Sequence, residues 1–152
     1  MNILLELECD LKLLNNFSKK LAKKTKVGDI FFLSGDLGTG KTTFTRLFIN
    51  SIFDTKNITR PKNIKSPSYP IMINYSLAKY EICHYDLYRL KHKSELLEIG
   101  ILEDFKNNIS IIEWPELILN NFSFTDYYLI QFEVINKYKR LLKIKHTNKN
   151  KL

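Results

Sequence analysis

The sequence predicts an α/β fold in which a mixed central sheet is flanked by helices and followed by a C-terminal β-hairpin. Short apolar runs typical of buried strands alternate with segments whose apolar residues recur at helical spacing. A glycine-rich turn joins the apolar run at 30–33 to one such helical segment. A chain of 152 residues suits one domain, so we expect residues 1–152 to form a single domain with a frayed tail at 146–152.

The individual elements follow from apolar spacing and from residues that begin helices or turns. Alternating apolar and β-branched residues predict strands at 3–8, 30–33, 69–75, 80–85, 109–114, 126–136 and 138–146. Helical spacing predicts helices at 11–24, from 41 through 52, and at 94–99, 101–106 and 115–119. Asp10 and Ser94 are suitable N-caps, and Pro115 suits a first helical turn. The polar segment 54–67 is expected to be irregular.

The glycine-rich turn carries a phosphate-binding motif. Gly35, Gly40, Lys41 and Thr42 fit the pattern G-x-x-x-x-G-K-[ST], with a strand before it and a helix after it. Glycines let backbone N–H groups surround an anion, the helix directs its positive N-terminus there, and Lys41 adds a full charge. The Thr42 hydroxyl is expected to bind Mg²⁺. We therefore expect a P-loop NTPase-like domain whose nucleotide contacts Gly35, Asp36, Leu37, Gly38, Thr39, Gly40, Lys41, Thr42 and Thr43.

Two acidic residues further along the chain are candidates for the other half of this site. Glu113 closes an apolar strand, where a carboxylate can hold the magnesium shell; the alternative is a surface carboxylate that caps the helix after Pro115. Asp86 follows the strand at 80–85 and could act as general base or orient water, or it could cap a turn. With Lys41, these acids are the predicted catalytic residues.

Residues beside these acids allow more than one interpretation. Arg89 could neutralise phosphate charge or pair with Asp86 or Glu95. Trp114 could cover the nucleotide or fill the core. His84 is interpreted as a strand histidine, because no second His or Cys accompanies it at metal spacing. The segment at 66–69 lies where a nucleotide-sensing loop could sit, although it is also an ordinary turn.

Missing motifs narrow the nucleotide and the reaction. An Asn-Lys-x-Asp guanine motif is absent, so ATP is favoured by elimination. A small-molecule kinase would be expected to have an arginine-bearing lid, and only Arg60 and Arg89 lie between the loop helix and the C-terminal hairpin. A phosphotransferase acting on a small metabolite stays open as an alternative.

The charge balance raises a second alternative, an ATP-gated RNA-binding module without catalysis. The formal net charge is +8, from 24 basic and 16 acidic residues, and an excess of positive charge favours polyanionic partners. Lysines at positions 19, 20, 23 and 24 form either a solvated helix face or a surface that faces tRNA. A lysine-rich composition can also reflect codon bias.

The same composition predicts a cytoplasmic protein without membrane segments. No stretch approaches the length of an apolar membrane span, and the first residues are acidic rather than basic as in a secretory signal. Cys9 and Cys83 lack metal-like spacing and are expected to be reduced and buried.

The motifs together resemble the bacterial TsaE (YjeE) ATPase family. They are GDLGTGKTTFTR (35–46), SPSY (66–69), HYDLYRL (84–90), SELLEIGILEDF (94–105) and IIEWPE (111–116), in family order and approximate spacing. The DLYR and EWPE stretches are more specific than the phosphate loop. The resemblance implies ATP hydrolysis in the biosynthesis of threonylcarbamoyladenosine (t6A) in tRNA. It also implies action on the TsaB–TsaD pair, with TsaD modifying adenosine of ANN-decoding tRNAs and tRNA contacted only through the complex.

The resemblance also assigns roles to individual residues. It gives Lys41 and Thr42 to phosphate and Mg²⁺, Glu113 to Mg²⁺, and a catalytic role to Asp86. Ser68 stands where the family usually has a switch-loop threonine, and it becomes a further expected Mg²⁺ ligand.

Two positions depart from the family pattern. Pro70 replaces a usual Thr or Ser and so removes a hydroxyl and a backbone donor, which is why any Mg²⁺ contact from this loop falls to Ser68. Leu47 replaces a small residue that often follows the arginine.

Overall fold

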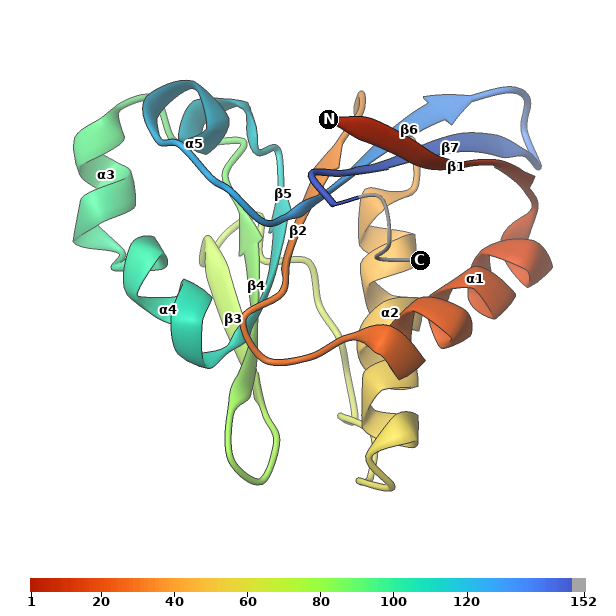
Figure 1. Cartoon of the computed structure of the whole chain (residues 1–152), viewed down its shortest axis with the longest axis horizontal. Coiled ribbons are helices and arrows are strands. Elements are labelled where there is room, and N and C mark those ends of the chain that lie inside the picture. The colour runs from red at the N-terminus through yellow and green to blue at the C-terminus, as the bar shows by residue number, and fades with distance from the viewer. Residues whose placement is uncertain (149–152) are drawn as a thin grey trace.

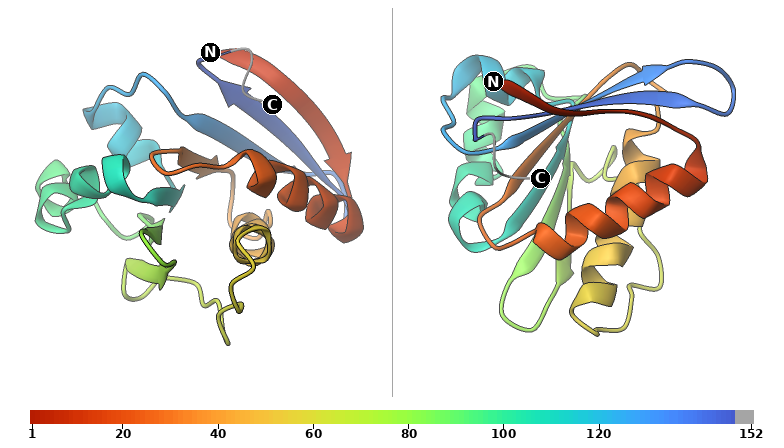
Figure 2. Two further views of the ribbon diagram at one scale, coloured as in Figure 1. Left: turned by 60° about the horizontal axis from the view of Figure 1, so that its bottom comes forward. Right: turned by 45° about the vertical axis from the view of Figure 1, so that its right-hand side comes forward.

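The computed structural model describes residues 1–148, which form one seven-stranded sheet with helices on both faces (Figure 1). Helices α1 (Leu11–Lys24) and α2 (Lys41–Thr55) cover one face. Helices α3 (Lys93–Glu98), α4 (Ile101–Asn107) and α5 (Glu116–Asn121) cover the other. Figure 2 shows α1 running beside α2 on its side of the sheet. The predicted α/β class with a mixed sheet is confirmed.

The sheet has the order β1-β7-β6-β2-β5-β4-β3. Its strands are β1 (Asn2–Cys9), β2 (Ile30–Ser34), β3 (Met72–Ser76), β4 (Glu81–Asp86), β5 (Ile109–Glu113), β6 (Tyr128–Val134) and β7 (Arg140–His146). β2 is parallel to β5 and β6, and β4 is parallel to β5. The other pairs, β1–β7, β3–β4 and the predicted hairpin β6–β7, are antiparallel. Because β2, β4 and β5 are parallel, their carboxyl ends meet at one edge of the sheet.

Helix α1 forms where its cap and spacing predict it. Asp10 Oδ1 accepts a hydrogen bond from the Leu13 N–H at 2.9 Å, which satisfies one free donor of the first turn. Leu14, Phe17 and Leu21 are buried at helical spacing. The lysines at 19, 20, 23 and 24 are exposed and form a solvated helix face, while their contact with tRNA stays a prediction.

The side chains of β2 supply both halves of the hydrophobic core. Phe31 and Leu33 belong to the half packed under α1 and α2, whereas Phe32 belongs to the half under α3, α4 and α5. This alternation follows from the two-residue period of a strand. The Phe31 ring packs edge-on against Phe48 of α2 with centroids 4.9 Å apart. β2 is therefore held from both faces, which fixes the start of the phosphate loop.

Two further features of the fold are the environment of the cysteines and the length of the helices. Cys9 and Cys83 are both free and buried, as predicted. No helix within residues 1–148 is long and apolar enough to cross a membrane.

Several element starts differ from the prediction: β6 and β7 each begin two residues later than predicted, and the starts of β3, α3 and α5 also differ. β3 begins at Met72 rather than at 69, because 68–70 form a turn and Ile71 has a φ of 70°. The N-cap of α3 is His92 and not Ser94. The Glu95 carboxylate accepts from the His92 N–H at 2.8 Å, which favours the earlier start. Pro115 is the N-cap of α5 and does not lie in its first turn.

The predicted tail at 146–152 also needs correction at its first residue. His146 is the last residue of β7, is fully buried, and pairs in register with Asn2 and Tyr128. It is therefore part of the sheet. Most of the predicted tail, residues 149–152, lies outside the described part of the chain.

We expect Phe48→Ala to lower the free energy of unfolding by about 3–5 kcal/mol, because it deletes a fully buried ring. Chemical denaturation measures this change. Leu97→Ala is the control, since Leu97 is 53% exposed and should change stability by no more than about 0.5 kcal/mol. Equal losses in the two variants would contradict the assignment of Phe48 to the core.

Candidate nucleotide-binding site

The phosphate loop leaves β2 and enters α2 at the edge where the parallel strands end. A Cβ atom at Gly35 would lie 2.5 Å from the Phe132 carbonyl oxygen, so only glycine fits there. Gly40, the N-cap of α2, has a φ of 105°, a region open mainly to glycine. The loop borders a cleft of about 310 Å³, lined by Leu37, Gly38, Thr39, Gly40, Lys41, Thr42, Thr43, Ser66, Ser68, Asp86, Glu113 and Trp114.

Lys41 is held by the loop itself. Its side chain is buried, and its Nζ donates to the carbonyl oxygens of Gly35 and Asp36, the latter at 2.9 Å. Gly35 and Asp36 are predicted nucleotide contacts that do not line the cleft, and their carbonyl oxygens contact Lys41. Nζ also lies 3.8 Å from the centroid of the Trp114 ring. Burial lowers the pKa of Lys41, and the carboxylate of Glu113 opposes this shift.

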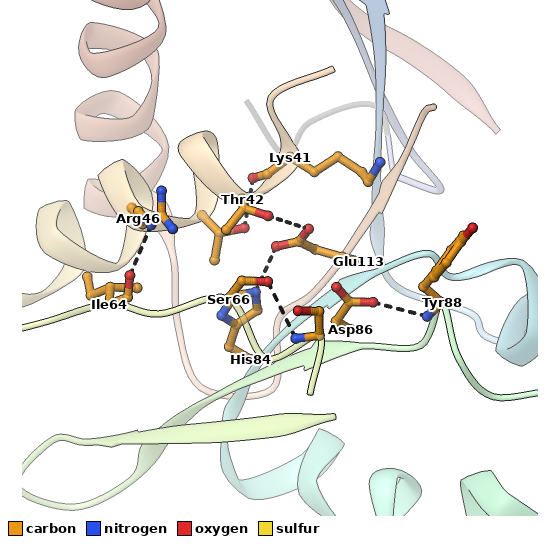
Figure 3. A network of polar contacts seen from close by, with 11 residues as sticks. Lys41, Thr42, Arg46, Ile64, Ser66, His84, Asp86, Tyr88 and Glu113 are labelled. Atoms are coloured by element: carbon orange, nitrogen blue, oxygen red, sulfur yellow. Dashed lines mark hydrogen bonds and ion pairs between the residues drawn. The ribbon is translucent and has the colours of Figure 1, made fainter. Parts of the chain in front are cut away.

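The structure brings Thr42 and Glu113 together. Thr42 Oγ1 donates to Glu113 Oε2 at 2.9 Å, although 71 residues separate the two in the chain (Figure 3). Glu113 closes β5, in register with Leu33 of β2 on one side and Asp86 of β4 on the other. Glu113 is only 2% exposed, so the alternative of a surface carboxylate is wrong.

Asp86 ends β4 and lines the same cleft. Its Oδ1 accepts from the Tyr88 N–H at 3.0 Å, so it also caps a turn, and the two interpretations of this residue are compatible. Burial raises the pKa of the Asp86 carboxyl, the Tyr88 N–H opposes the rise, and the charge of Glu113 adds to it. The charges of Asp86 and Glu113 therefore interact within the cleft.

The segment between α2 and β3 contributes Ser66 and Ser68 to the cleft. Ser68 is exposed, and its N–H donates to Ser66 Oγ at 3.4 Å. Arg46 of α2 anchors the approach to this segment, since its Nε donates to the Ile64 carbonyl at 2.9 Å. Ser68 thus lies at the rim of the cleft that Thr42 also lines, although the two residues belong to different segments of the chain.

Arg89 contacts the same segment. Its Nη1 donates to the Tyr69 carbonyl at 3.4 Å, and its guanidinium lies over the Tyr69 ring at 5.1 Å. Within residues 1–148 no ion pair joins Arg89 to Asp86 or Glu95. The local pairing considered from the sequence is therefore not formed.

Trp114 borders the cleft instead of filling the core. Its φ of 58° turns the chain directly after Glu113. Its ring lies against that of Tyr88, with centroids 4.7 Å apart, and against the Lys41 ammonium. Because Trp114 is the single tryptophan of the chain, its fluorescence reports on this cleft.

Sequence reasoning missed two residues that contact the site. His84 is fully buried on β4, and its Nε2 lies 2.8 Å from Glu113 Oε1. Arg140 Nε donates to the Thr39 carbonyl at 3.0 Å, which ties the start of β7 to the phosphate loop. The sequence did contain an indication for His84. Residues two apart in a strand share a face, and Asp86, a predicted site residue, lies two positions after His84. No local pattern indicated Arg140.

The donor set suits nucleotide phosphates with Mg²⁺. The oxygen donors Thr42, Ser68, Asp86 and Glu113 border one cleft, and the N-terminus of α2 offers N–H groups to an anion. The described residues contain no group of three or more His, Cys, Asp or Glu that could hold a metal ion by itself. Mg²⁺ is usually bound by one or two carboxylates together with substrate phosphates and waters. The site therefore fits the ion in company with a nucleotide.

A glycine-rich loop between β2 and α2, beside parallel strands that end in acids, defines a P-loop NTPase-like protein. A crystal structure of YdiB from Bacillus subtilis has this fold, with a TM-score of 0.70, 22% sequence identity, and coverage of 99% of this chain and 92% of that one. The family model described as "Threonylcarbamoyl adenosine biosynthesis protein TsaE" matches residues 10–146. The chain belongs to the TsaE family.

Individual relatives agree with this assignment. A protein of Rickettsia typhi named tRNA threonylcarbamoyladenosine biosynthesis protein TsaE is 37% identical over 133 residues, which cover 88% of each chain. A Bacillus subtilis protein of the same name is 38% identical over 106 residues, covering 66% of this chain and 62% of that one. The resemblance predicted from residues 28–116 is confirmed and extends over a longer stretch.

We expect Asp86→Asn to raise the free energy of unfolding of the nucleotide-free protein at pH 7, because the amide oxygen can still accept from Tyr88 without a buried charge. Burial raises the folded-state pKa of Asp86 above its unfolded value. The native state then binds more protons between the two values, and stability falls as pH rises through this window. The advantage of the variant should disappear below about pH 3.9, where both states are protonated.

Urea denaturation over a pH series measures this effect. Glu98→Gln is a suitable control, since Glu98 is an exposed residue at the end of α3. A variant of Asp86 that is less stable than the wild type at pH 7 would contradict the stated effect of burial.

Proposed function

We propose that this protein is a Mg²⁺-dependent ATPase required for t6A modification of ANN-decoding tRNAs, and that it acts on the TsaB–TsaD complex. Membership of the TsaE family supports the pathway, and the hydrogen bond between Thr42 and Glu113 supports the site. The names of the Rickettsia and Bacillus relatives point to the same pathway. The proposal includes a single ATPase domain in the cytoplasm that reaches tRNA only through the complex.

The phosphate-binding half of the site works by positioning and charge. The N–H groups of the loop and the N-terminus of α2 bind the β- and γ-phosphates, and Lys41 neutralises part of their charge. Thr42, Glu113 and Ser68 would hold Mg²⁺, which when bound stabilises negative charge on the phosphate oxygens. Trp114 borders the cleft with its ring packed against that of Tyr88, and it limits the access of water.

Asp86, the remaining acid of the cleft, activates or orients the attacking water. Asp86 lies at the same edge of the sheet as Glu113, one strand further along. Because burial raises its pKa, Asp86 is a better proton acceptor than an exposed aspartate, which suits a general base or a water-orienting group. Lys41, Asp86 and Glu113 are the proposed catalytic residues, and hydrolysis is slow until the partner proteins bind.

We expect Lys41→Ala and Glu113→Ala to lower ATP hydrolysis by about a hundredfold or more, because each removes charge that stabilises the transferred phosphate or its metal. Release of inorganic phosphate by the protein with its partners measures this. Lys23→Ala, on the exposed face of α1, is a matched lysine control that should keep full activity. Transfer of labelled γ-phosphate to a metabolite, instead of release to water, would favour a phosphotransferase.

We expect deletion of the gene to abolish t6A in tRNA, and the wild-type gene, but not its Lys41→Ala variant, to restore it. Mass spectrometry of digested tRNA nucleosides measures the modification. Normal t6A in the deletion strain would refute the proposed function. Tight binding of tRNA by the isolated protein, lost steeply as salt rises, would instead support an RNA-binding module.

A further inference from the structure

We propose that His84 is a positioning residue that orients Glu113, and that Glu113 in turn directs the proton of the Thr42 hydroxyl away from the metal position. The inference rests on the proposed magnesium–nucleotide site and adds to it a side chain that contacts neither nucleotide nor metal. The three side chains come from β4, β5 and the first turn of α2 (Figure 3).

Both oxygens of the Glu113 carboxylate have a donor. His84 Nε2 lies 2.8 Å from Oε1, and Thr42 Oγ1 lies 2.9 Å from Oε2. An ionised carboxylate only accepts hydrogen bonds, so Nε2 carries the proton that joins His84 to Glu113. With one donor on each oxygen, the plane of the carboxylate is fixed in a site where Glu113 is 2% exposed.

Packing alone does not explain a histidine at this position. His84 is 0% exposed and pairs in register with Ile73 on one side and Ile111 on the other. Its Nδ1 has no hydrogen-bond partner among the described residues. A buried polar group without a partner costs free energy, and an aliphatic residue would avoid that cost. The contact between Nε2 and Glu113 is the interaction that an aliphatic residue could not replace.

The hydroxyl of Thr42 makes this orientation matter. A threonine hydroxyl has one proton to donate and two lone pairs. While its proton points to Glu113 Oε2, its lone pairs stay free for a cation, and each Glu113 oxygen keeps a further lone pair for the same ion. If the carboxylate turned, the proton could point toward the cation and repel it. His84 therefore acts on Thr42 through Glu113, and groups that orient metal ligands in this way typically contribute 10–100-fold in metal affinity.

Magnesium titration of ADP binding tests this role, with Trp114 fluorescence as the readout. We expect His84→Leu to raise the Mg²⁺ concentration for half-maximal response by about tenfold or more, and to leave ADP binding without Mg²⁺ unchanged. His84→Gln should restore most of the response, because its amide N–H can take the place of Nε2–H. His84→Asn, whose amide is too short to reach Glu113, should behave like His84→Leu.

Further variants separate positioning from a loss of packing. His146→Leu removes another fully buried histidine, at the end of β7 and outside the cleft lining, and should change thermal stability without changing the Mg²⁺ requirement. In a Glu113→Ala background, His84→Leu should add no further loss, because the side chain through which it acts is gone. If His84→Leu is less stable than the wild type, the comparison between His84→Gln and His84→Asn still tests the positioning role, provided that both variants fold.

The outcomes distinguish this inference from the proposed function. If His84→Leu and His84→Asn need no more Mg²⁺ than the wild type, the positioning role is refuted while the nucleotide site stands. If the loss in His84→Leu persists undiminished in the Glu113→Ala background, His84 does not act through Glu113. If the wild type shows no Mg²⁺-dependent ADP binding, both the proposed function and this inference fail.

Discussion

The hydrogen bond between Thr42 and Glu113 depends on the arrangement of the sheet. It joins the first turn of α2 to the end of β5, and it forms where β2 and β5 are neighbours that run in the same direction. The register of Leu33 with Glu113 places the carboxylate beside the start of the phosphate loop. Phe31 and Phe32 hold β2 in this position from opposite faces, so the core of the protein determines where the oxygen donors of the site meet.

The sequence predicts those parts of the site that lie in continuous segments better than it predicts contacts between distant segments. The phosphate loop is a continuous pattern, and Glu113 and Asp86 each close an apolar run, so their positions at one sheet edge follow from parallel strands alone. The contact of His84 with Glu113 depends on β4 and β5 being neighbours, and the strand order leaves no trace in local spacing. Arg140 reaches Thr39 across 101 residues, again through a pairing that only the folded chain reveals.

The boundaries that were predicted wrongly share a physical cause. Periodicity identifies where apolar residues recur, but the first residue of an element is decided by hydrogen bonds to its free ends. Glu95 accepts from the N–H groups of Lys91 and His92, both at 2.8 Å, and thereby moves the start of α3 ahead of Ser94. His146 is a polar residue next to a polar C-terminal segment, which is why the sequence predicts that it belongs to the tail. Strand pairing with β1 on one side and β6 on the other keeps it within the sheet.

The turn before β3 connects the rim of the cleft to its buried acids. Ile71 has a φ of 70°, which costs of order 1–3 kcal/mol for a β-branched residue. Two hydrogen bonds hold it there: its N–H donates to the Pro67 carbonyl at 2.6 Å, and its carbonyl accepts from the Asp86 N–H at 2.9 Å. Pro70 has no N–H to offer in this turn. The strained residue Ile71 is hydrogen-bonded directly to the backbone of Asp86. The conformation of the segment that carries Ser68 is therefore coupled to the position of the Asp86 backbone.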